Sequence, residues 1–142
     1  MSSVRRVPTV VNLGGEGEVP GAINVNAFIS PSMWNRNFAA QLDESLVIRR
    51  SAHDTGLPEG FADSVIANHF PIQYDELIID ETGSRASISI LAVEIVRILK
   101  SGGGVRFACS SCDPGSLATA FRTAGLTDVV ATATGTVEGR KP

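Results

Sequence analysis

The feature that most constrains this chain is a glycine-rich turn between two short runs rich in β-branched residues. The runs cover residues 8–13 and 22–25, and both patterns predict strands. Gly14, Gly15 and Gly17 come directly after the first run. Glycine permits positive φ and lets the backbone approach a bound group that a Cβ would displace. Bare main chain at the end of a strand therefore indicates a nucleotide-like ligand.

Length and composition restrict the class of protein. The 142 residues predict one domain over 1–142, and a chain with 43% hydrophobic and 19% charged residues is typical of a globular protein. The net charge of −3 and the absence of a long basic run disfavour nucleic acid as a direct partner. No apolar stretch approaches the length of a membrane span, and residues 1–6 lack the apolar core of a signal peptide. We therefore expect a cytoplasmic protein that does not bind membranes.

Two cysteines, Cys109 and Cys112, form one C-x-x-C pair. A single pair offers too few ligands for a structural zinc site, so we expect no metal. A redox dithiol usually stands directly at a helix start, whereas residues 113–115 separate this pair from the next helix-like segment. The favoured interpretation is two small residues at a strand end, with a redox or metal role as the alternative.

Strand-like and helix-like segments alternate along the chain. Further strands are expected at 46–48, 64–68 and 105–109, and helices at 31–42, 84–100 and 114–124. The segment 84–100 is the clearest helix, because its apolar residues recur at i, i+3, i+4 and i+7 before the glycines at 102–104. Two runs at about 128–133 and 136–140 are close enough to form a hairpin. The pattern predicts an α/β fold with a mostly parallel sheet and an antiparallel C-terminal hairpin.

The connection between the first two strands is unusually short. Neighbouring parallel strands normally need a crossover of about a dozen residues, and only residues 14–21 lie between these two runs. Either a shortened connection without a helix is used, or the topology differs.

Four motifs follow one another along nearly the whole chain. Residues 12–16 and 20–26 are similar to N-L-G-C-G and P-G-W-I-N-V-D, and residues 53–58 and 61–66 to D-x-x-x-L-P and F-D-x-I. Residues 97–103 match R-x-L-K-P-G-G, and residues 121–126 match F-x-x-A-G-F. Each motif alone is common. Their order and spacing resemble the class I S-adenosylmethionine-dependent methyltransferases, which implies a Rossmann-like fold and S-adenosyl-L-methionine as the cofactor.

The resemblance also implies which residues hold this cofactor. Gly14 and Gly15 would face its methionine and ribose, Asn26 would reach the ribose, and Asp54 would accept a hydrogen bond from the adenine amine. The complete set of implied cofactor-binding residues is Asn12, Gly14, Gly15, Asn26, Asp54, Leu57 and Asn68. His69 would border the transferred methyl group as a general base. All of these positions lie at expected strand ends, where open α/β sheets bind their ligands.

Other interpretations of single residues remain open. Asp54 is equally typical of a residue that caps a turn, and His69 is more often a structural histidine than a base. Asn26 stands where the family pattern has an acidic residue, so this position carries no charge. Glu16 stands where glycine is usual, and its carboxylate could pair with the cofactor's ammonium group but would repel its carboxylate.

Two functions follow from these matches and departures. The first is a methyltransferase that acts on a small-molecule or peptide acceptor, with a homodimer or a partner protein completing the acceptor site. The second is a degenerate, non-catalytic module with a methyltransferase fold that serves in protein interaction or regulation. A dinucleotide-dependent redox enzyme is disfavoured, because no G-x-G-x-x-G turn leads into a helix.

Overall fold

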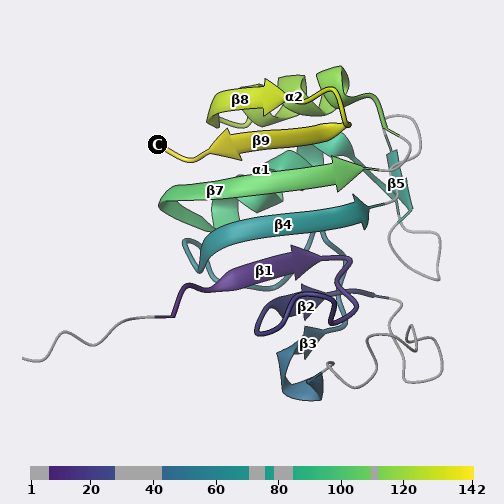
Figure 1. Cartoon of the computed structure of the whole chain (residues 1–142), viewed down its shortest axis with the longest axis vertical. Coiled ribbons are helices and arrows are strands. Elements are labelled where there is room, and N and C mark those ends of the chain that lie inside the picture. Colours follow the sequence, from purple (N-terminus) through teal and green to yellow (C-terminus); the bar gives the residue numbers. More distant parts are fainter. Residues whose placement is uncertain (1–6, 28–42, 71–75, 79–84, 110–111) are drawn as a thin grey trace, which may run out of the picture.

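A computed structural model describes residues 7–27, 43–70, 76–78, 85–109 and 112–142. Its main feature is a seven-stranded sheet with the order β3-β2-β1-β4-β7-β9-β8. The strands are β1 (Val10–Leu13), β2 (Ile23–Val25), β3 (Val47–Ile48), β4 (Ala62–Phe70), β7 (Leu99–Cys109), β8 (Thr127–Ala131) and β9 (Thr136–Arg140). The neighbouring strands β3, β2, β1, β4 and β7 run parallel to one another. β9 pairs antiparallel with β7, and β8 pairs antiparallel with β9. In Figure 1 the arrowheads of β1, β4 and β7 therefore point to one edge of the sheet. The predicted α/β fold with its antiparallel hairpin is confirmed.

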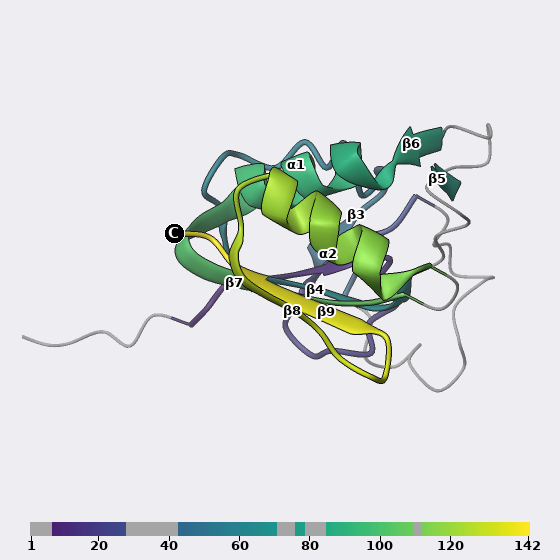
Figure 2. The same cartoon turned by 90° about the horizontal axis from the view of Figure 1, so that it is seen from above.

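The helices α1 (Ile88–Ile98) and α2 (Pro114–Thr123) pack on the same face of this sheet (Figure 2). Apolar residues of both helices meet those of the central strands in one core. Phe107 of β7 and Phe121 of α2 contact each other edge to face, with ring centroids 6.3 Å apart. A short helix η1 (Glu44–Leu46) precedes β3, and β5 (Glu76–Ile78) pairs with β6 (Arg85–Ser87) as a separate antiparallel ribbon.

α1 is shorter than the segment 84–100 that periodicity predicts. Residues 85–87 belong to β6, and the side chain of Ser87 caps the helix by accepting a hydrogen bond from the N–H of Ile90. At the other end, Leu99 is already extended and begins β7. β7 thus starts six residues earlier than the predicted strand at 105–109, because Leu99 pairs with Ala62 and Gly104 pairs with Arg140.

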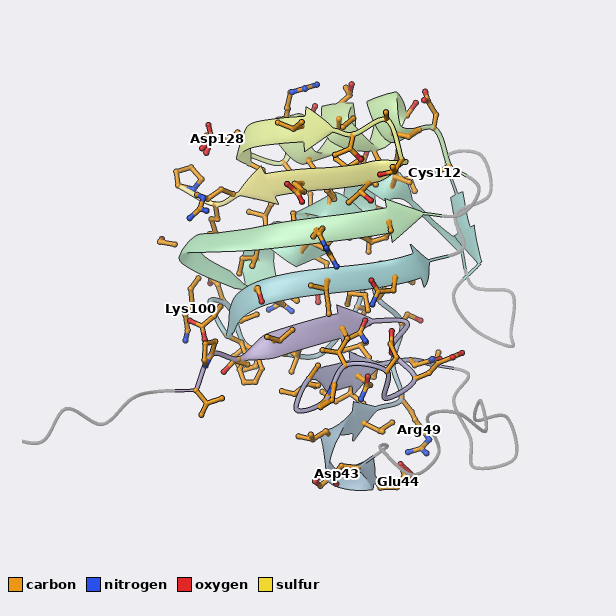
Figure 3. All side chains as sticks on the ribbon, viewed as in Figure 1. Asp43, Glu44, Arg49, Lys100, Cys112 and Asp128 are labelled. Carbon is orange, nitrogen blue, oxygen red and sulfur yellow. The ribbon has the colours of Figure 1, made fainter. Side chains whose placement is uncertain are left out.

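α2 begins at Pro114, where the sequence predicts a helix, so the cysteine pair lies directly before it. Asp113 is its N-cap and accepts from the N–H of Gly115, and Pro114 is its first residue. Residues 113–115 are therefore the start of the helix and not a spacer before it. Cys112, directly before the cap, is disulfide-bonded. Figure 3 shows Lys100 near the amino end of β7 and Cys112 beyond its carboxyl end.

The connection between β1 and β2 is the shortened one without a helix. The two strands are parallel neighbours with Val11 opposite Ile23, and residues 14–22 join them through turns. Gly14 and Gly21 have φ of 70° and 80°, and the N–H of Gly14 donates to the carbonyl of Val25 at 2.7 Å. These backbone angles let so short a link reverse direction twice.

The strand expected at 64–68 extends over β4, and the hairpin expected near 128–140 is formed by β8 and β9. The helix expected at 31–42 lies outside the described residues. Within the described part of the chain, no helix is long and apolar enough to cross a membrane.

Candidate functional site

Asparagines gather near the carboxyl ends of β2, β1 and β4, which are neighbours in the sheet. Asn12 lies in β1, Asn24 and Asn26 lie in and just after β2, and Asn68 lies in β4. We call these residues the amide cluster. Asn12 is 0% exposed and Asn24 is 2% exposed. Buried amides require hydrogen-bond partners, and the loop of residues 14–18 supplies most of them.

The carboxylate of Glu18 joins two strands of the amide cluster. Its Oε1 accepts from Nδ2 of Asn12 at 2.9 Å and from the N–H of Glu16 at 2.8 Å. Its Oε2 accepts from Nδ2 of Asn68 at 3.2 Å. Partial burial disfavours the charged carboxylate, but these donors outweigh burial and hold the pKa of Glu18 below its ordinary value. Glu18 is therefore an ionised group fixed across the ends of β1 and β4.

The space that a Cβ of residue 15 would occupy is filled by side chains of the protein itself. A Cβ there would collide with Oδ1 of Asn24 and lie 2.8 Å from Cγ of Asn12. The carbonyl of Gly15 accepts from Nδ2 of Asn26 at 3.1 Å, and Oδ1 of Asn24 accepts from the N–H of Gly17 at 3.3 Å. The close approach that glycine permits at this position is to the protein's own amides, which corrects the sequence-based reason for this glycine.

One acceptor of the amide cluster has no partner. Oδ1 of Asn12 is buried and receives no hydrogen bond in the part of the chain that the structure describes. Orphaned acceptors are rare in buried positions, and a water or a bound group is their usual explanation.

Asp54 is exposed and pairs with Arg50. Its side chain is 71% exposed, with Oδ1 3.2 Å from Nη2 of Arg50. Leu57 is buried in the core. In the spacing D-x-x-x-L-P, the position four residues before Leu57 is held by His53, whose Nδ1 is buried and unpartnered within the described residues. The geometry therefore favours His53 over Asp54 as the side chain turned inward from this loop.

A partly buried ion pair between Glu94 and Arg97 fixes the loop that carries His53 and Leu57. Glu94 of α1 is 8% exposed and accepts from the N–H and the hydroxyl of Thr55 at 2.9 and 2.7 Å. Its carboxylate also binds Arg97 through Nε at 2.6 Å and Nη2 at 2.8 Å. Burial opposes the charged form, but the bonds from Arg97 and Thr55 outweigh it, and the pKa of Glu94 is lowered.

The structure thus assembles only part of the predicted site. Asn12, Gly14, Gly15, Asn26 and Asn68 meet in one region, Asp54 and Leu57 belong to a separate loop, and the side chain of His69 lies outside the described residues. Sequence reasoning missed Asn24 and Glu18. The signal for Asn24 was its spacing of two residues from Asn26, which places both side chains on one face of an extended strand.

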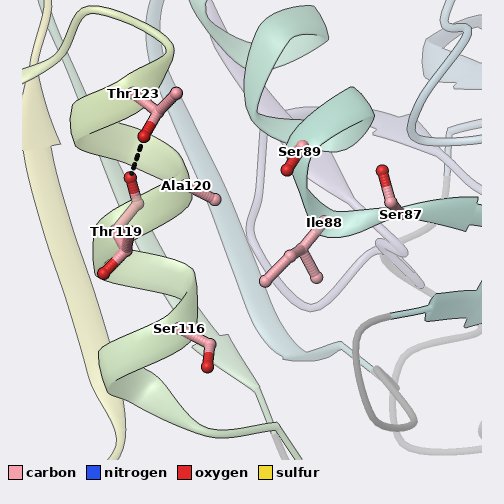
Figure 4. A pocket seen from close by; sticks show the side chains of 7 residues that line it. All are labelled: Ser87, Ile88, Ser89, Ser116, Thr119, Ala120 and Thr123. Carbon is pink, nitrogen blue, oxygen red and sulfur yellow. Dashed lines mark hydrogen bonds between the residues drawn. The ribbon is translucent and has the colours of Figure 1, made fainter.

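A hollow lies between the start of α1 and one side of α2, apart from the amide cluster (Figure 4). Its volume is about 370 Å³ and its lining is rich in hydroxyl groups: Ser87, Ile88, Ser89, Ser116, Thr119, Ala120 and Thr123. The hydroxyls of Ser116, Thr119 and Thr123 bond to their own helix or its cap. In the described part of the chain, its lining carries hydroxyl and apolar side chains and no charged one. Among the described residues, no group of three or more side chains could hold a metal ion.

No protein-family model and no curated sequence matches this chain. Solved structures match in fold. A chain of the complex between the Haloferax volcanii Trm112 methyltransferase activator and a methyltransferase has a TM-score of 0.62 at 17% identity, covering 98% of this chain and 84% of that one. A SAM-dependent methyltransferase of Thermotoga maritima has a TM-score of 0.60 at 13% identity, with coverage of 98% and 84%. Human N-acetylserotonin methyltransferase in complex with SAM has a TM-score of 0.55 at 16% identity, with coverage of 94% and 47%.

These likenesses define a class of fold. The chain has the Rossmann-like fold of the class I S-adenosylmethionine-dependent methyltransferases, as its motifs predict. Because one fold supports many functions, activity has to be argued from the site.

Proposed function

We propose that this protein binds S-adenosyl-L-methionine at the carboxyl ends of β2, β1 and β4 and transfers its methyl group to a small-molecule or peptide acceptor. The observation that carries the proposal is the convergence of the amide cluster and Glu18 at this edge. In open α/β sheets, ligands bind outside the carboxyl ends of the strands.

The chemistry of these residues fits the cofactor. S-adenosylmethionine offers an ammonium group, ribose hydroxyls and an adenine amine as hydrogen-bond donors, and this edge offers the Glu18 carboxylate and the unpartnered Oδ1 of Asn12 as acceptors. We assign Asn68 and Gly14 to the methionine part and Asn26 to the ribose. Leu57 and His53 border the adenine side, and Asp54 remains a second candidate there.

Methyl transfer requires little from the protein beyond position. Bound S-adenosylmethionine would supply an activated methyl group. The chain's residues then have to hold the acceptor in line with this group, which can account for much of the rate. We assign His69 the role of a base for acceptors that must lose a proton. A partner protein or a second copy of the chain would complete the acceptor site, and the likeness to a methyltransferase solved with its activator supports the former.

A non-catalytic module is the second candidate, and two observations favour it. Asn12 and Asn24 fill the space beside Gly15, and Arg50 pairs with the carboxylate of Asp54. Both interactions occupy groups that the family pattern assigns to the cofactor. In this candidate the fold is retained for protein interaction or regulation.

Binding of S-adenosylhomocysteine, the demethylated product, separates the two candidates. We expect saturable one-to-one binding by calorimetry, and a stabilisation of about 2.7 kcal/mol at a ligand concentration of a hundred times Kd. Asn26→Ala should weaken binding about tenfold, equivalent to about 1.4 kcal/mol. Absence of binding by the wild-type protein would overturn the proposal in favour of the module.

Two further variants refine this experiment. Glu44→Ala changes an exposed carboxylate of η1, outside the amide cluster, and should leave the affinity unchanged. Asp54→Ala tests the adenine contact separately. An unchanged affinity there would remove Asp54 from the site and leave the amide cluster in place.

A further inference from the structure

The charge of the candidate site comes from an unexpected residue. The members of the amide cluster are neutral, and Asn26 occupies the position where the family pattern has an acid. Glu16, the acid that the sequence suggests near the methionine tail, is exposed and contributes its backbone N–H. Glu18 is the residue whose carboxylate turns into the network.

This carboxylate is held by neutral donors. Its hydrogen-bond partners among the described residues are amide side chains and backbone N–H groups, and no lysine, arginine or histidine in that part of the chain pairs with it. By contrast, Glu94 has Arg97 as its counter-ion. Partly buried carboxylates without a counter-ion are uncommon, because desolvation of a charge is costly unless an opposite charge compensates it.

The hydrogen-bond geometry leaves room for a donor. Oε1 accepts two hydrogen bonds, from Asn12 and Glu16, whereas Oε2 accepts one among the described residues, from Asn68. Each carboxylate oxygen can accept two. By these bonds Oε2 is the less occupied oxygen, and it lies on the β4 side, where Asn68 is assigned to the methionine part of the cofactor.

We propose that Glu18 is the ligand-binding anion of this edge and makes the site select ligands whose tail carries an ammonium group. In S-adenosylmethionine the group it binds is the α-ammonium. This inference rests on the proposed function. Glu18 reaches the site because the connection between β1 and β2 is short and has no helix, so residues 14–18 fold back over the strand ends.

The opposite role for Glu18 would be to block the site. In that role its carboxylate occupies the place of a ligand group, and removing its charge would strengthen binding. The two roles predict changes of affinity in opposite directions, so one substitution distinguishes them.

The test compares two ligands that differ in their tails. S-adenosylhomocysteine carries the α-ammonium, and 5′-methylthioadenosine shares its thioether nucleoside but has no amino-acid tail. Glu18→Gln should reduce the affinity for S-adenosylhomocysteine at least tenfold and leave that for 5′-methylthioadenosine within twofold. Glu16→Gln, the same change two residues away on an exposed side chain, should leave both affinities unchanged.

Other results contradict the inference in distinct ways. Unchanged or tighter binding of S-adenosylhomocysteine by Glu18→Gln would overturn it, and so would an equal loss for both ligands, which would indicate a distorted loop. If Glu18→Gln does not fold, Glu18→Asp, which keeps the charge on a shorter side chain, should weaken S-adenosylhomocysteine selectively, and an equal effect on both ligands would overturn the inference. A wild-type protein that binds neither ligand would instead overturn the proposed function and, with it, this inference.

Discussion

Glu94 and Glu18 are both kept ionised, but by different partners. Glu94 binds Arg97 and Thr55 inside the molecule, so its charge is compensated and its bonds fix the loop of residues 51–57. Glu18 binds neutral donors and keeps an uncompensated charge at the edge of the sheet. The first carboxylate therefore stabilises the fold, and the second is the one that we propose for ligand binding.

Replacing Glu94 should destabilise the protein severely. Glu94→Ala leaves the N–H and hydroxyl of Thr55 without their acceptor and Arg97 without its counter-ion. We expect the free energy of unfolding to fall by about 3 kcal/mol, measured by urea denaturation at pH 7. Glu44→Ala breaks an ion pair with Arg49 in which both side chains are about half exposed, and should cost less than about 1 kcal/mol. Similar losses in the two variants would contradict a structural role for Glu94.

Acid unfolding gives an independent measurement on the same variant. The pKa of Glu94 is lowered from 4.5, so its contribution to stability is complete above that pH and is lost as the pH falls through the lowered value. Between about pH 6 and pH 3, the wild-type protein should therefore lose more stability than Glu94→Ala does. Parallel pH profiles would show that the carboxylate is not held in its charged form.

The sequence predicts the residue types of the site better than their orientation. The sequence singles out Glu16 as the acid of the glycine-rich turn, whereas in the structure Glu18 is the acid whose carboxylate binds the amide cluster. The positive φ values of Gly14 and Gly17 determine which side chain turns inward, and these angles follow from hydrogen bonds to Val25 and Asn24 that lie further along the chain. Such contacts are not visible in a local motif.

At the scale of elements, the junction of α1 and β7 shows how long-range pairing changes a local pattern. Apolar periodicity correctly predicts a helix, and the glycines at 102–104 indicate a stop. The helix nevertheless ends at Ile98, because the extended chain from Leu99 onward pairs with β4 on one side and β9 on the other. Element type was therefore predictable here, whereas the boundary depended on partners distant in sequence.

The two glycines of this junction should respond differently to alanine. A Cβ on Gly103 would lie 2.8 Å from the carbonyl oxygen of Asp63 and 2.9 Å from that of Lys100, so backbone would have to move. Gly102 has φ of 82° with open space around its Cβ position. We expect Gly103→Ala to reduce the free energy of unfolding by about 3 kcal/mol and Gly102→Ala by about 1 kcal/mol, both measured by urea denaturation. A larger loss for Gly102→Ala would show that backbone angle and not packing limits this turn.

At the scale of the whole molecule, the sequence predicts the α/β class and the hairpin but not the position of the last strand. β9 lies between β7 and β8, so the end of the hairpin that is last in sequence contacts the centre of the sheet. Alternating strand and helix patterns cannot specify this order, because it depends on which edge of β7 is left unpaired. The order of the motifs along the chain indicates this strand order only through the resemblance to a known fold.

Lys141 connects the chain beyond β9 to the junction of α1 and β7. Its N–H donates to the carbonyl of Gly103 at 2.8 Å, and its carbonyl accepts from the N–H of Gly102 at 2.7 Å. Its Nζ donates to the carbonyls of Val96 and Leu99 at 2.8 and 2.7 Å, at the carboxyl end of α1. A cation at this end of a helix satisfies free carbonyls and interacts favourably with the helix dipole.

Lys141→Met should therefore destabilise the protein without weakening the candidate site. Methionine keeps an apolar stem but removes the ammonium, and we expect the free energy of unfolding to fall by about 1.5 kcal/mol. Arg140→Met is the matched control, because Arg140 is exposed and donates to the carbonyl of Gly102 at 3.2 Å; it should cost less than about 0.5 kcal/mol. Lys141 lies at the amino end of β7, whereas the amide cluster lies towards the carboxyl ends of its neighbours, so the affinity of Lys141→Met for S-adenosylhomocysteine should equal that of the wild-type protein. A loss of affinity together with stability would mean that the two ends of the sheet are coupled, and that the amide cluster depends on the packing of α1.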